Sequence, residues 1–138
     1  MSLDFTFEQV PQFVEVVKVV RKSGGGFVAH NRISFMKNTE IDAYDWQTAS
    51  PAAEASILAM LEEKAAAKIE VGISVAWKGS GHGGTLHIQP ESRRIFIIPY
   101  ADSPQVAPGF IGLGWYLDRL TADFAPFGLL SVEASDIP

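Results

Sequence analysis

The feature that most constrains the fold is the alternation of apolar and polar residues in the segment KIEVGISVAWKG, residues 68–79. The apolar residues Ile69, Val71, Ile73, Val75 and Trp77 share one face, and the other face carries Glu70, Gly72, Ser74 and Lys78. Successive side chains of a strand point to opposite faces of its sheet, so this pattern predicts a strand with one buried face.

Two further segments extend this strand into a sheet. Thr85–Gln89 and Arg94–Pro99 are short, rich in strand-forming residues and separated by the turn-like sequence PESR. Strands this short and this closely spaced along the chain pair as hairpins. We therefore predict a three-strand antiparallel meander over residues 69–99.

Three helices are expected. In residues 8–22, polar side chains recur every three or four positions, Thr6 and Gln9 resemble a capping box, and three glycines follow at 24–26. Ser50-Pro51 is typical of a helix start, followed by an apolar stripe through about residue 67 (Ile57, Leu58, Leu61 and Ala65). A last helix is expected to begin near Trp115, to pack Leu117, Leu120 and Phe124, and to end before Pro126 and Gly128.

The remaining segments complete the predicted order. Residues 27–36 favour a strand, 37–50 and 100–114 are expected to be loops, and Leu129–Ala134 is a last strand that could lie parallel inside the sheet. The order α-β-α-β-β-β-α-β predicts one α+β domain over residues 1–138. Its architecture is a two-layer sandwich, with a mostly antiparallel sheet and helices packed on one face.

Composition narrows the classes of function. The net charge of −5 argues against nucleic acid as a partner, because such binding depends on Lys and Arg contacts to phosphates. Without cysteine, there is no thiolate catalysis, disulfide or Cys-based metal site. There is no apolar run long enough to span a bilayer, and the N-terminus lacks the features of a secretory signal. We expect no membrane association and a cytoplasmic location.

The glycines of GSGHGG, residues 79–84, satisfy the letter pattern G-x-G-x-x-G. In dinucleotide-binding folds these glycines open a helix, whose N-terminal amides hold the pyrophosphate. Here they precede TLHIQ, which favours a strand, so we expect a hairpin loop and no cofactor. His82 within this loop is expected to be the most exposed histidine and a contact for a partner.

The sequence contains no residue pattern typical of a metal site or a catalytic site. A zinc site would need His30, His82, His87 and an acid such as Asp45 to converge, and we expect His87 on the surface instead. Among the serines, none lies in G-x-S-x-G, and the paired acids Glu62-Glu63 are expected to be solvated. We therefore lean away from an enzyme.

Two segments are candidates for partner binding. DAYDW, residues 42–46, interleaves carboxylates with aromatic side chains, which are enriched at interface hot spots. GFIGLGWYLDRL, residues 109–120, places apolar side chains in a long loop and beside it. With the glycine loop, the predicted partner-binding residues are Asp42, Tyr44, Asp45, Trp46, His82, Phe110 and Trp115.

The resulting hypothesis is a small acidic protein-binding module, for instance an inhibitor or immunity-type protein that neutralises a basic partner enzyme. Its basis is the acidic tract at residues 38–63, which carries six acids and no base. One alternative is a small-molecule-binding domain or enzyme that uses the sheet face with residues 100–114 as a lid, and with His30, His87 and Asp45 as its polar groups. The other is a structural subunit of an assembly, for which self-association is expected.

Overall fold

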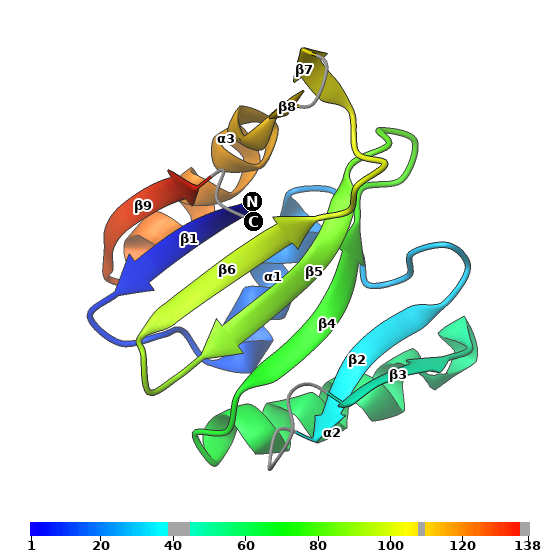
Figure 1. Cartoon of the computed structure of the whole chain (residues 1–138). Helices are drawn as coiled ribbons and strands as arrows, with labels where there is room; N and C mark the ends of the chain where they lie inside the picture. Colours follow the sequence, from blue (N-terminus) through cyan, green and yellow to red (C-terminus); the bar gives the residue numbers. More distant parts are fainter. Residues whose placement is uncertain (39–44, 108–109, 136–138) are drawn as a thin grey trace.

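The computed structural model describes residues 1–38, 45–107 and 110–135 (Figure 1). In this part of the chain, seven strands form one sheet in which every neighbouring pair is antiparallel. In order across the sheet they are β3 (Asp45–Ala49), β2 (Ile33–Asn38), β4 (Val71–Ala76), β5 (Gly83–Gln89), β6 (Arg94–Pro99), β1 (Ser2–Phe7) and β9 (Leu129–Ser135).

The predicted meander forms the centre of this sheet. Ile73 pairs with Leu86, and Leu86 pairs with Ile97, so one buried row crosses β4, β5 and β6. The row continues onto β1 through Leu3, which is opposite Ile97. The apolar face predicted from the alternation in residues 69–77 is therefore the core face, although Ile69 itself precedes β4 and is exposed.

Three helices cover the core face: α1 (Phe13–Lys22), α2 (Glu54–Ala66) and α3 (Leu113–Phe124) (Figure 1). Val16, Leu61 and Tyr116, one from each helix, belong to the same buried cluster as the core row of the sheet. The fold is thus an α+β two-layer sandwich with helices on one face, as predicted. Ser50 caps the 3-10 turn η1 (Pro51–Ala53) that leads into α2, because its Oγ accepts a hydrogen bond from the Ala52 amide.

The N-terminus differs from the prediction, because residues 2–7 form a strand that was not predicted. Leu3, Phe5 and Phe7 alternate with polar residues and are buried, which is a period of two. Thr6 pairs within β1, so it does not cap a helix, and α1 begins only at Phe13. Pro11 lies in the connection before α1, where its missing amide costs no helical hydrogen bond.

Both edges of the sheet also correct the prediction. Residues 45–49, expected in a loop, form the edge strand β3, whereas β2 begins at Ile33 and leaves residues 27–32 outside a regular strand. At the other edge, β9 pairs antiparallel with β1 and does not lie parallel inside the sheet. Gly128, with φ +81°, makes the turn from η2 (Ala125–Phe127) into β9.

The segment predicted as one long loop contains two short strands, β7 (Gln105–Ala107) and β8 (Phe110–Ile111). They stand beyond the end of the sheet, close to α3 (Figure 1). Helix α3 then starts at Leu113, where Leu120 and Phe124 are buried as predicted but Leu117 is 38% exposed. In the described part of the chain, the helices are too short or too polar to cross a membrane.

Candidate functional site

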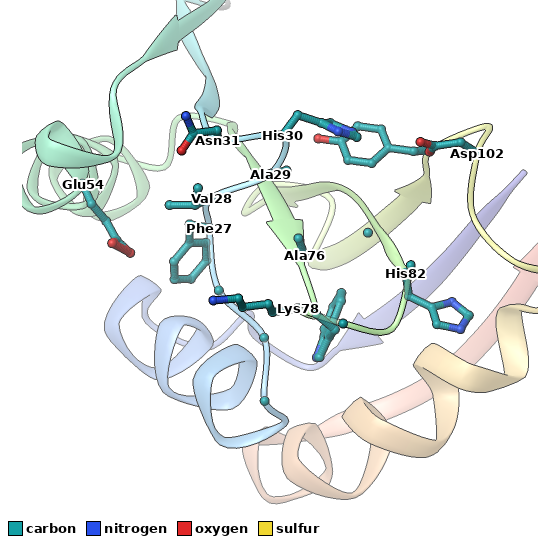
Figure 2. Close-up of a pocket in the computed structure, with 18 residues that line it drawn as sticks. Phe27, Val28, Ala29, His30, Asn31, Glu54, Ala76, Lys78, His82 and Asp102 are labelled. Atoms are coloured by element: carbon teal, nitrogen blue, oxygen red, sulfur yellow. The ribbon is translucent and has the colours of Figure 1, made fainter.

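A cleft of about 780 Å³ lies at the end of the sheet where β4 finishes and β5 begins (Figure 2). One wall is the connection between α1 and β2, and the other includes the residues that follow β6. Ligand sites in proteins commonly enclose 300–1,000 Å³, so the cleft has the size of a binding site. The polar and charged residues that line it include His30, Asn31, Glu54, Lys78, His82, Tyr100 and Asp102.

Two glycines of this region, Gly83 and Gly84, are explained by close backbone packing. A Cβ on Gly84 would collide with the carbonyl oxygen of Ile98, and one on Gly83 would lie 2.9 Å from the carbonyl oxygen of Val75. Strand β5, and not a helix, follows the pattern G-x-G-x-x-G, so the arrangement expected of a dinucleotide site is absent from these residues. Across the cleft, a Cβ on Gly25 would lie 2.8 Å from the Trp77 ring.

Gly83 fixes the wall that follows β6. Its carbonyl oxygen accepts hydrogen bonds from the Tyr100 amide at 2.9 Å, the Ser103 hydroxyl at 3.2 Å and the Tyr116 hydroxyl at 3.2 Å. The Gly83 amide in turn donates to the Tyr116 hydroxyl at 3.1 Å. Because Tyr116 and Ser103 are buried, these bonds are shielded from water and hold residues 100–103 against β5.

A strained turn presents His30 at the mouth of the cleft. His30 and Asn31 both have positive φ, +54° and +62°, between the reciprocal backbone hydrogen bonds of Ala29 and Arg32. This is the geometry of a type I′ turn, in which glycine usually relieves the strain. The turn places the His30 ring 5.4 Å from the Tyr100 ring, with an interplanar angle of 53°.

The charges of the cleft differ in their surroundings. Glu54 is paired with Arg21 at 3.5 Å, whereas Asp102 is exposed and forms no ion pair within the described residues. Burial, and then the negative charge of Asp102, raise the pKa of Tyr100, so this hydroxyl stays protonated at neutral pH. Lys78 reaches toward Phe27, away from His30 and Asp102 (Figure 2).

His82, the residue of the glycine loop that was predicted to contact a partner, is among the residues that line the cleft. Its ring, however, points toward α3 (Figure 2). The ring stacks on Trp115 at 3.9 Å with an interplanar angle of 15°, and the Arg119 guanidinium lies 3.8 Å over Trp115. Partial burial, and then Arg119, lower the pKa of His82. The structure therefore joins two predicted partner residues, His82 and Trp115, in one stack, but His30 is the exposed histidine.

Of the other predicted partner residues, only Trp46 has a described side chain. Asp42 and Tyr44 are outside the described residues, as are the side chains of Asp45 on β3 and Phe110 on β8. Trp46 is partly buried on the sheet face opposite the helices, which we call the open face. Its ring is 5.6 Å from that of His87.

His87 corrects a second prediction, because it is buried although it lies on the open face. Its ring stacks on Phe96 at 4.4 Å with an interplanar angle of 2°, and its Nε2 is 3.0 Å from the Thr85 hydroxyl. Burial, and then the charge of Arg94, lower the pKa of His87 to about 4. His87 and His30 thus belong to separate environments.

Two cleft residues, Tyr100 and Asp102, were not singled out from the sequence. Both belong to the segment 100–114, whose length was the only signal available. Among the described residues, no group of three His, Asp or Glu side chains is placed to hold a metal ion.

The chain matches no family model, no curated protein and no solved structure in the comparisons with known proteins.

Proposed function

We propose that the protein is a small acidic protein-binding module, of the inhibitor or immunity type, whose cleft receives a basic partner. The observation that carries the proposal is the exposed Asp102 carboxylate, which forms no ion pair within the described residues and lies at the mouth of a cleft of about 780 Å³. A carboxylate in such a position can pair with a cationic side chain without first breaking an internal bond.

The shape of the cleft supports the same proposal. The wall formed by residues 100–103 is held by the hydrogen bonds of Gly83, and the opposite wall contains the His30–Asn31 turn. A preformed site loses little conformational entropy on binding, which favours a tight complex. The net charge of −5 would in addition speed the encounter with a basic protein at low salt. We further propose a cytoplasmic location, which the lack of cysteine supports.

One alternative has its own supporting observation. The volume of the cleft and its mixture of His30, Tyr100, Lys78 and Asp102 also suit a small molecule with polar groups. Such a ligand would raise the melting temperature of the isolated protein. A protein partner would instead be retained from a cell extract at a fixed stoichiometry.

The test is affinity capture from an extract of the native host, at low and at high salt, followed by mass spectrometry. Four baits are compared: the wild type, Asp102→Lys, Asp118→Lys and Trp46→Ala. Asp118 is an exposed acid on α3 that does not line the cleft, so its variant carries the same change in net charge. We expect a stoichiometric basic protein on the wild type and on Asp118→Lys, released as salt rises and lost from Asp102→Lys.

Equal loss from Asp102→Lys and Asp118→Lys would assign the binding to net charge and reject the cleft. Capture of no stoichiometric basic protein would reject the proposed function in favour of the small-molecule alternative. Loss from Trp46→Ala with retention on Asp102→Lys would move the interface to the open face.

A further inference from the structure

We propose that the cleft recognises the guanidinium group of an arginine carried on a loop of the partner. This inference rests on the proposed function and names the chemistry of the same site. A planar guanidinium can stack on an aromatic ring while it donates two parallel hydrogen bonds to a carboxylate, and the compact ammonium of lysine cannot do both.

The aromatic part of the site is formed by Tyr100 and His30. Their rings, 5.4 Å apart and inclined by 53°, come from opposite walls of the cleft. His30 is held there by a turn with φ +54°, a conformation that is unfavourable for a residue other than glycine. The turn is fixed by the reciprocal backbone hydrogen bonds between Ala29 and Arg32.

The carboxylate part of the site is formed by Asp102. It lies two residues after Tyr100 and lines the same cleft, on the side of His30 and away from Glu54 (Figure 2). Glu54, the other acid of the cleft, already contacts Arg21. The Lys78 side chain extends to the other end of the cleft, so its charge is kept away from Asp102 (Figure 2).

The size of the cleft indicates what carries the arginine. A volume of about 780 Å³ falls in the range that encloses a whole drug-sized ligand, so it exceeds the needs of one side chain. A loop that inserts with its arginine at the Tyr100 end would fill the remaining space. The glycines of the α1–β2 connection, Gly24 and Gly26, let its backbone approach this wall closely.

The inference is tested without knowledge of the partner, by titrating the isotope-labelled protein with N-acetyl-arginine amide and following its amide resonances. The matched probes are N-acetyl-lysine amide, which keeps the charge, and N-acetyl-citrulline amide, which keeps the planar shape and removes the charge. We expect the arginine probe to shift the amides of residues 29–31 and 100–102, with an affinity at least about threefold higher than that of either other probe.

The site is then tested with variants. Asp102→Asn and Tyr100→Leu should each weaken the arginine probe by about threefold or more, and Asp118→Asn should leave its affinity unchanged. Circular dichroism of each variant verifies its folding, and Asp102→Asn, which changes one exposed side chain, keeps the test valid if Tyr100→Leu does not fold.

Equal affinity for the arginine and lysine probes, shifts outside the cleft, or no shift at all would overturn the inference. Its failure is distinguishable from that of the proposed function. Capture of a basic protein that depends on Asp102, together with no preference for the arginine probe, would reject only the recognition of a guanidinium group. A selective arginine probe without any protein partner would reject only the protein-binding role.

Discussion

Replacing Tyr116 with phenylalanine should destabilise the protein through the loss of a single oxygen atom. The Tyr116 side chain is 0% exposed, and its hydroxyl accepts from the Gly83 amide at 3.1 Å and donates to the Gly83 carbonyl at 3.2 Å. Without the hydroxyl, the carbonyl keeps the Tyr100 amide and the Ser103 hydroxyl as donors. The buried Gly83 amide loses the hydrogen bond that the hydroxyl accepts.

The size of the effect follows from the difference between the Gly83 amide, which loses its acceptor, and the Gly83 carbonyl, which keeps two donors. A buried donor left without an acceptor costs about 1–3 kcal/mol, whereas the carbonyl that keeps other donors adds little. For a domain of this size, each kcal/mol lowers the melting temperature by about 4 °C. Tyr116→Phe should therefore reduce the free energy of unfolding by about 1–3 kcal/mol and the melting temperature by about 4–12 °C.

The assay is urea unfolding together with calorimetry, with Tyr100→Phe as the matched control. Tyr100 is partly buried, and its hydroxyl makes no hydrogen bond to another described residue, so its removal should change the free energy of unfolding by less than about 0.5 kcal/mol. A Tyr116→Phe protein as stable as the wild type would refute the role of Gly83 and Tyr116 in holding this wall. So would an equal loss in the control.

Three further predictions concern the sheet. The pKa of His87 is about 4 in the folded protein and near 6.5 in the unfolded chain, so the free energy of unfolding should be at its full value above pH 6.5 and fall by up to about 3 kcal/mol toward pH 4. In urea unfolding at a series of pH values, His87→Phe should reduce this fall. The same dependence on pH in wild type and variant would contradict the low pKa of His87. Gly84→Ala should lower the free energy of unfolding by at least about 2 kcal/mol in the same assay, because its Cβ would collide with the Ile98 carbonyl. The control Gly26→Ala, whose Cβ meets no atom within 4 Å, should change the free energy of unfolding by less than about 0.5 kcal/mol. Ile73→Asp should abolish cooperative unfolding by burying a charge in the core, and a cooperative thermal transition would show that the residue faces solvent.

The sequence predicted the parts of the fold in which local pattern and burial agree. Strand β6 has the predicted bounds, and α2 follows its Ser50-Pro51 start, because a period of two or a cap is a local signal. Strand β1 was missed although Leu3, Phe5 and Phe7 alternate. Six residues of alternation were outweighed by the helical spacing of the segment that follows.

The site was less predictable because its parts meet only through the topology. His30 and Tyr100 come from segments on either side of β4 and β5, and no short-range pattern relates them. His87 was predicted on the surface because β5 alternates, but its partners Phe96 and Trp46 come from other strands and cover it. Gly83 and Gly84 are part of a segment that matches the letters of a nucleotide-binding motif, but glycine is needed at these two positions because neighbouring backbone atoms leave no room for a Cβ.

The central claim, that the cleft is where a basic partner binds, is tested most directly by hydrogen exchange of the purified complex against the free protein. We predict slower amide exchange at residues 24–31 and 100–103 in the complex, with β3 and β9 unchanged. Protection confined to β3 and the open face, or to α3 and the β7–β8 hairpin, would contradict the account and place the interface elsewhere.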